Sequence, residues 1–181
     1  MSIEASQAFV LQGENIRFSP GDQDRLVLVR HGVGEVDAAE AALRLRARQV
    51  LLARRGADVV VRACCPLEIV YVGFVREGCF ADPDGAAFFE DLLRLWPACL
   101  PLDATDDIVQ TAGAVCAVLR GGTASAASTR MAARGRLFTL LALLHTRLIG
   151  LRAGCEAGIG SSRFEASLGH IAANVWVSRG A

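Results

Sequence analysis

The sequence predicts an α+β fold, with an antiparallel β-barrel in the first part of the chain and helices in the second. Short apolar runs separated by turns that contain Gly or Pro follow one another up to about residue 78, as in antiparallel barrels and sandwiches. After residue 78, apolar residues recur three and four positions apart, which is the period of an amphipathic helix. This change of period is expected to mark the end of the barrel.

Seven segments in the first part have the pattern of strands. Residues 43–48 alternate strictly, and this predicts that Leu43, Leu45 and Ala47 point inward while the three arginines between them point outward. Gly32 and Gly34 are expected to end the preceding strand. The seven segments are residues 8–11, 16–18, 26–31, 43–48, 50–53, 58–62 and 67–74.

Three helices are expected in the second part, over residues 86–96, 103–120 and 125–149. Asp103 or Thr105 is the expected N-cap of the second helix, because Asp and Thr side chains accept hydrogen bonds from free N–H groups of the first turn. The predicted division of the chain is a barrel over 1–78, a helical region of the same domain over 79–149, a Gly-rich linker over 150–162 and a last helical segment over 163–181.

Composition limits the classes of function. The chain has 181 residues, about the size of one domain, and 52% of them are hydrophobic, so a disordered protein is excluded. The 19 basic residues, all arginine, balance 19 acidic residues, and no segment gathers a run of like charges. Because DNA attracts proteins mainly through clustered cationic charge, we expect this chain alone not to bind DNA.

Leucines of the third helix carry the strongest signal for a partner. They recur at heptad-like spacing and are flanked by arginines, which is typical of a two-helix interface, so we predict a homodimer. The alternative is that the same stripe packs against the barrel or against the helix at 103–120, and both can hold on different faces. The predicted interface residues are Leu137, Leu141, Leu144 and Leu148.

A barrel of this length is similar to the jelly-roll barrels of cupins, and many enzymes of that kind need two or three histidines and a carboxylate around a metal. His31 is alone in the β region, and His145 and His170 belong to helices. We therefore expect no catalytic residue, no metal site and no cofactor. A cupin-type metal-dependent enzyme remains the alternative.

A ligand inside the barrel is the expected basis of function. A few polar groups within an apolar barrel can orient a small molecule, and the strand register gives His31, Arg62, Glu68 and Tyr71 as candidates. The sequence leaves an outward, solvated placement of Arg62 and Glu68 open. A filled barrel without a ligand is a further alternative, because Val59–Val61 suits a packed interior.

Cysteines and apolar runs indicate the cellular compartment. The six cysteines form no CxxC pair, and the first 20 residues lack a signal sequence, so reduced thiols and a cytoplasmic location are expected. The longest uncharged apolar run, residues 137–146, lies between Arg136 and Arg147 and is too short to span a bilayer. We therefore expect no membrane partner.

The order of these parts resembles the N-terminal half of AraC-family (AraC/XylS-type) transcription regulators. Residues 51–56 look like the strand and turn before that family's ligand-facing strand, residues 69–74 like its last barrel strand, and residues 137–148 like its dimer helix. Residues 163–174 look like the opening helix of its DNA-binding domain, which ends in an Ile-x-x-Asn pattern, here Ile171 to Asn174.

This resemblance implies a ligand-sensing and dimerisation domain that controls DNA binding by a full-length regulator. The effector is an unknown small molecule. DNA is expected to bind only through a C-terminal domain with two helix-turn-helix motifs, of which this chain holds the first helix.

Overall fold

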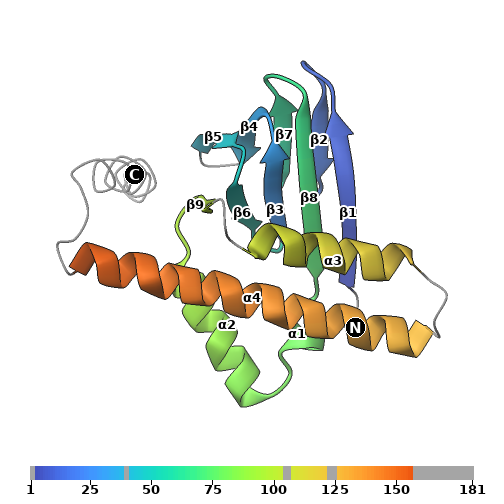
Figure 1. Ribbon diagram of the computed structural model, residues 1–181, viewed down its shortest axis with the longest axis vertical. Helices are drawn as coiled ribbons and strands as arrows, with labels where there is room; N and C mark the ends of the chain where they lie inside the picture. The colour runs from blue at the N-terminus through green and yellow to red at the C-terminus, as the bar shows by residue number, and fades with distance from the viewer. Residues whose placement is uncertain (1–2, 39–40, 104–106, 122–125, 157–181) are drawn as a thin grey trace.

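The structure is a computed structural model that describes residues 3–38, 41–103, 107–121 and 126–156. Eight strands form a barrel and the helices follow it, as Figure 1 shows. The strands are β1 (Ile3–Val10), β2 (Asn15–Phe18), β3 (Asp24–His31), β4 (Val33–Ala38), β5 (Ala41–Arg46), β6 (Gln49–Ala53), β7 (Val59–Ala63) and β8 (Leu67–Phe74), with the short β9 (Leu100–Pro101) added later in the chain.

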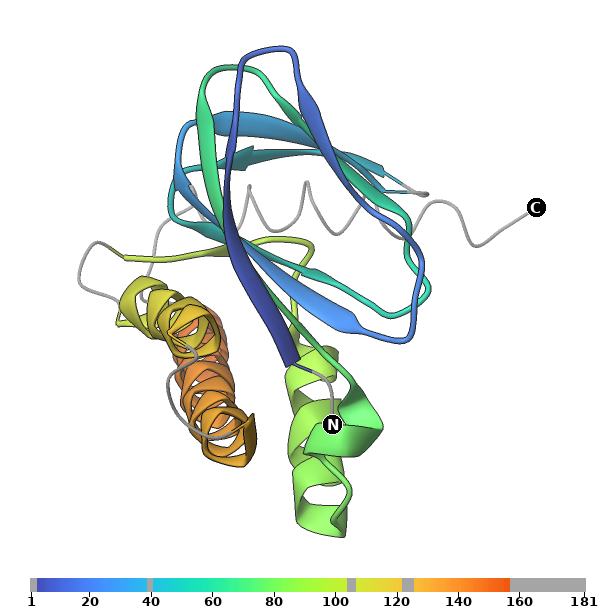
Figure 2. The ribbon, with the colours of Figure 1, turned by 90° about the vertical axis from the view of Figure 1, so that its right-hand side faces the viewer.

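The strands form two antiparallel sheets that face each other. Sheet A has the order β1-β8-β3-β6-β9 and sheet B the order β2-β7-β4-β5. Without β9, these are the two sheets of a jelly roll, in which consecutive strands alternate between the walls of the barrel except at the β4–β5 hairpin. Figure 2 shows the walls edge-on, with α1 to α4 all on one side of the barrel. The predicted antiparallel jelly-roll barrel followed by helices is confirmed.

Each face of sheet A covers a separate hydrophobic core. Between the two sheets lie side chains such as Val27, Val61 and Ile69, which are 0% exposed and form the barrel interior. The opposite face of sheet A contributes Leu28 and Val72 to a second core that it shares with the helices. Because both faces of sheet A are buried, its strands carry apolar residues in runs. Sheet B buries only the face toward the barrel interior, so apolar residues alternate along its strands.

Two parts of the barrel differ from the prediction. Gly34 does not end a strand but lies within β4, whose one large buried side chain is that of Val36. A strand with a single large apolar residue has little periodic signal. Ala47 does not point inward but is exposed, because β5 ends at Arg46 and the chain turns through Arg48, which has a φ of 63°.

Within the described residues, four helices follow the barrel: α1 (Arg76–Cys79), α2 (Pro83–Leu95), α3 (Ile108–Arg120) and α4 (Ala126–Glu156). The prediction for α2 is confirmed, with Phe89, Leu92 and Leu93 buried and Asp82 as an N-cap that accepts from Gly85 N at 2.8 Å. Asp103 is not the N-cap of α3, because the helix begins at Ile108 and Asp107 takes the N-cap position. Thr105 lies outside the described residues.

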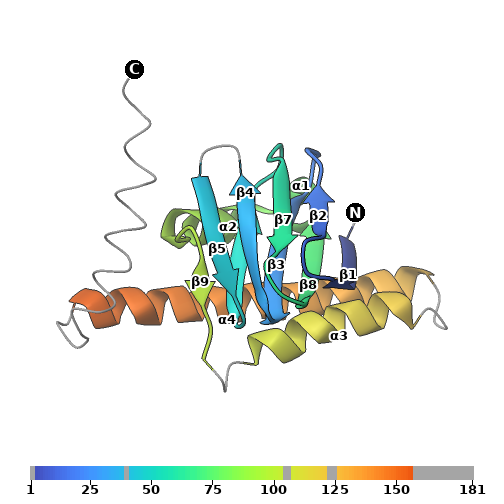
Figure 3. The ribbon, with the colours of Figure 1, turned by 90° about the horizontal axis from the view of Figure 1, so that it is seen from above.

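The long helix α4 is adjacent to α3 and extends beyond the barrel on both sides, as Figure 3 shows. It continues to Glu156, so the predicted linker cannot begin at residue 150. The helix continues past Gly150 because Leu151, Arg152 and Ala153 have high helix propensity. The remainder of the predicted linker and the segment 163–181 lie outside the described residues.

One helix in the described part of the chain, over Ala127–Gly154, is long and apolar enough to cross a membrane by length and composition. Of that apolar window 28% is buried, and most of the leucines of α4 belong to the buried part, since α4 packs on α2, α3 and β1. An apolar face that packs on neighbouring elements is typical of a core helix.

Candidate functional site

The predicted interface leucines lie inside the protomer. Leu137, Leu141 and Leu144 are 0% exposed and Leu148 is 4% exposed, and all four belong to the core between the helices and sheet A. They cannot form a dimer interface without leaving that core. The alternative placement, against α3 and the side of the barrel, is the one observed.

The opposite face of α4 is not covered by the described parts of the chain. Met131 is 71% exposed and Ile149 is 48% exposed, the largest apolar side chains on this face. Apart from Met131, the residues of this face are mostly small and recur at spacings of four and three along the helix. This set, which we call the small-residue face, consists of Ser128, Ala132, Gly135, Thr139, Ala142, Thr146, Ile149 and Ala153.

Of the four predicted ligand residues, Tyr71 is the one that packs against the barrel interior. Its ring meets that of Phe18 edge-on, with 5.2 Å between the ring centroids. The interior beside it is filled by buried aliphatic side chains such as Val29, Val36 and Leu67. Tyr71 is therefore part of a packed core.

Glu68 lies on the opposite face of sheet A and gathers polar partners there. Its Oε1 accepts from Arg30 Nη1 and from Gln7 Nε2, both at 2.7 Å. His31 Nε2 is 3.8 Å from the other carboxylate oxygen. A register shift between Val29 and His31 brings His31 opposite Glu68. The structure thus brings two of the predicted residues together, but outside the barrel.

Arg62 is exposed on the outer face of sheet B. The alternation of β7 explains this, because Val59, Val61 and Ala63 are buried toward the interior and Arg62 falls between them. Three of the four predicted residues thus lie outside the interior, and the outward alternative for Arg62 and Glu68 is the one observed.

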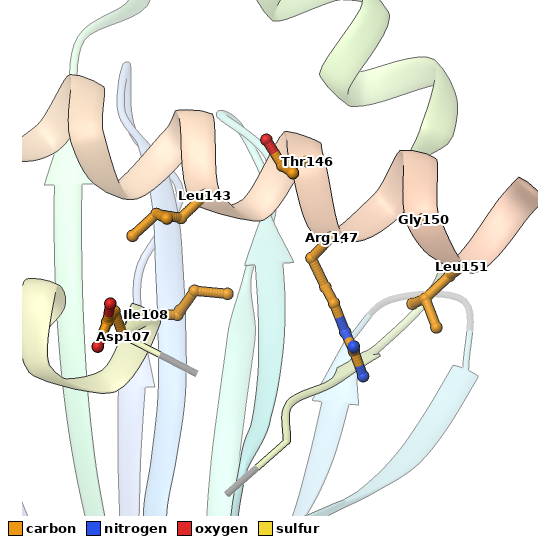
Figure 4. Close-up of a pocket in the computed structure, with 7 residues that line it drawn as sticks. All are labelled: Asp107, Ile108, Leu143, Thr146, Arg147, Gly150 and Leu151. Carbon is orange, nitrogen blue, oxygen red and sulfur yellow. The ribbon is translucent and has the colours of Figure 1, made fainter. Parts of the chain in front are cut away.

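A cavity of about 520 Å³ lies between the start of α3 and the second half of α4, as Figure 4 shows. Its wall is mostly apolar, and its charged groups are Asp107 and Arg147. Arg147 Nη1 pairs with Asp103 Oδ2 at 2.6 Å, while its buried Nε has no hydrogen-bond partner among the described residues. The cavity is lined by Asp107, Ile108, Leu143, Thr146, Arg147, Gly150 and Leu151.

By its volume and mostly apolar wall, this cavity can accept a small apolar molecule. Sequence reasoning treated Arg147 only as a flank of the leucine stripe. The sequence did offer one signal: Arg147 comes directly before Leu148 of the leucine stripe, so its side chain lies at the edge of the face that packs inward.

Metal chemistry has little support in the described part of the chain, where no three His, Cys, Asp or Glu side chains come together as a metal site. His145 is engaged elsewhere: its Nε2 lies 2.8 Å from Asp91 Oδ2. Hydrogen bonds from His145 and then from Arg94 lower the pKa of Asp91. His170 lies outside the described residues.

The strand order decides the fold of the β region. It is a cupin-like jelly roll. No model of a known protein family matches the chain, and no curated protein sequence does.

Several solved structures resemble the cupin-like part of this chain. A conserved protein of unknown function from Streptococcus pyogenes is 18% identical, with 40% of this chain and 64% of that chain aligned at a TM-score of 0.38. The Cnp3 cupin domain of Schizosaccharomyces pombe is 14% identical, with 41% and 56% aligned at a TM-score of 0.38. A cupin 2 conserved barrel domain protein from Leptotrichia buccalis is 12% identical, with 40% of each chain aligned at a TM-score of 0.36. This chain spans less than two thirds of each of them.

Proposed function

We propose that this chain is the sensing and dimerisation part of a cytoplasmic AraC-type transcription regulator and has no enzymatic activity of its own. The observation that carries the proposal is α4, whose 31 residues extend for about 46 Å at about 1.5 Å per residue. One side of this helix is fixed to the cupin-like barrel by buried leucines. The other side offers the small-residue face to a second copy.

The small-residue face suits an antiparallel pair of α4 helices. Residues without bulky side chains allow two helices to approach to about 8 Å, the short end of the usual range. A two-fold axis between residues 140 and 141 places Met131 at the level of the partner's Gly150, and Ile149 at the level of the partner's Ala132. Met131 and Ile149 are 18 residues apart, which is five full turns, so they lie on the same flank of the helix and Met131 packs beside the partner's Ile149, while the small residues let the two helices approach.

The charges of α4 predict how this dimer responds to salt. Five arginines and no acidic residue lie between residues 126 and 155, and Arg130 and Arg136 are exposed. Two such helices repel each other at low ionic strength, and salt screens that repulsion. We therefore expect the dimer to tighten as salt is added.

A small-molecule effector would act by favouring one arrangement of the two α4 helices, which requires different affinities for the two arrangements. The cavity beside Arg147 favours this role, because α4 forms one wall of it. A second candidate function is a dimerisation module without a ligand. The filled barrel interior, with Val27, Val61 and Ile69 at 0% exposed, favours that candidate.

The test of the proposal is a reporter assay in cells. The chain is fused to a DNA-binding domain that represses its operator only as a dimer. We expect repression by the wild-type fusion and loss of repression by the Ala142→Glu fusion at equal protein level. Absence of repression by the wild-type fusion, with the fusion folded and expressed, would refute dimerisation as its function.

A further inference from the structure

Two adjacent cysteines occupy the turn between β7 and β8, at the end of the barrel farthest from α4 (Figure 1). Cys64 and Cys65 are both half-buried. The other cysteines whose side chains are described are buried: burial raises the pKa of Cys99 to about 12, and it also raises the pKa of Cys79 and Cys116. Among the cysteines whose side chains are described, the accessible thiols are therefore the two in this turn.

The geometry of the pair favours a shared ligand over a disulfide. The Cys64–Cys65 peptide bond is trans, so the two Cα atoms are about 3.8 Å apart. Disulfides usually join Cα atoms that are about 4.4–6.8 Å apart and hold their sulfurs at about 2 Å. A thiophilic ion bonded to both sulfurs, each at about 2.3 Å as in zinc thiolate sites, lets the sulfurs stay farther apart.

Backbone groups of Val33 hold the sulfur of Cys65 in place. Val33 N donates to Cys65 Sγ at 3.2 Å, and the Cys65 thiol donates to Val33 O at 3.9 Å. Soft thiolate ligands of this kind suit thiophilic ions.

We propose that Cys64 and Cys65 form a dithiol site for trivalent arsenicals or a similarly thiophilic metalloid. In the reaction with an arsenic(III) oxide group, each sulfur forms one bond to arsenic, and the two bonds to the oxide oxygen break. The two thiol protons leave with that oxygen as one molecule of water. Arsenic and sulfur keep their oxidation states, so the step needs no oxidant or reductant.

The turn that holds the two cysteines is hydrogen-bonded to the start of β4. Cys64 N donates to Val33 O at 2.9 Å, so both cysteines are bonded to the first residue of β4. Gly32, with a φ of +92°, lies so close to Pro66 that an added Cβ would be 2.3 Å from Pro66 O. Movement of the Cys65 sulfur toward a bound ion therefore acts on Val33 and on the start of β4.

The test uses phenylarsine oxide and intact-mass spectrometry on the full chain. Cys155 is replaced by Ser throughout, and Cys64→Ser and Cys65→Ser are each added to that background. We expect one adduct per chain in C155S that resists excess 2-mercaptoethanol and is removed by 2,3-dimercaptopropanol. Each added substitution should weaken retention on the order of 100-fold or more, because linked ligands gain that much from their effective concentration.

A second measurement covers the case in which a variant fails to fold. The wild-type adduct is digested and mapped, and it should lie on the peptide that contains residues 64 and 65. Hydrogen exchange at Val33 N should also change on binding. An adduct that 2-mercaptoethanol removes from C155S, or one that maps to Cys155, would overturn the proposal. Because the assay needs neither dimer nor DNA, its failure leaves the proposed regulator function untouched.

Discussion

Truncation of a buried leucine tests whether α4 belongs to the protomer core. Leu144 is 0% exposed in the core shared with α3 and sheet A. Leu144→Ala is therefore expected to cost about 2–5 kcal/mol of unfolding free energy, through lost burial and a residual cavity. That is a large share of the 5–15 kcal/mol or so by which domains are usually stable. It corresponds to a melting temperature lower by roughly 4–20 °C, at about 2–4 °C per kcal/mol for a domain of this size.

The assay is urea unfolding followed by circular dichroism, in an Ala142→Glu background so that dimerisation does not contribute. Thr146→Ala is the matched control, because Thr146 is exposed on the same helix and such changes stay within about 0.5 kcal/mol. A cost below about 1 kcal/mol for Leu144→Ala would refute the reasoning, because the leucine stripe would then face solvent in the free protomer. By the same argument, Leu141→Arg should unfold the protomer and not yield a folded monomer.

Other expected outcomes concern charges. Arg76→Met should lower the free energy of unfolding in urea by about 3–5 kcal/mol, because it leaves the fully buried Asp24 carboxylate without the guanidinium that donates to both its oxygens at 3.1 Å. An Arg76→Met, Asp24→Asn double variant that is no more stable than Arg76→Met alone would contradict this. The pKa of Asp91 is lowered by hydrogen bonds from His145 and Arg94, so the stabilisation is present above the ordinary carboxyl pKa and is lost as pH falls through the lowered one. Asp91→Asn should therefore be less stable near neutral pH and lose less stability on acidification below about pH 4, as measured by the urea midpoint against pH. Finally, the dimer dissociation constant should fall as sodium chloride rises from about 0.05 to 0.5 M, and a rise would argue against an interface flanked by like charges.

The fold could be predicted from the sequence because its turns and periods are local signals. Short apolar runs with Gly or Pro turns specified most of the strands, and Phe89, Leu92 and Leu93 specified the buried face of α2. β4 was missed because Val36 is its one large buried side chain.

The candidate site was harder to predict because sequence periodicity does not say what covers an apolar face. The leucine stripe of α4 was recognised correctly, but whether another helix of the same chain or a second copy covers it depends on tertiary packing. Similarly, both faces of β8 are buried, so Ile69 and Val70 give no alternation from which the direction of Glu68 could be read. The register shift beside His31 is also invisible in the sequence.

Sedimentation equilibrium on three proteins tests the central claim, that the small-residue face of α4 joins two copies. The proteins are the wild type, Ala142→Glu and, as a control, Arg44→Glu, which places a new carboxylate on the exposed side of β5. We predict a wild-type dimer, a folded Ala142→Glu monomer and an Arg44→Glu dimer, with folding checked by circular dichroism. A wild-type monomer at all concentrations, or a dimer that Ala142→Glu leaves unchanged, would contradict the account.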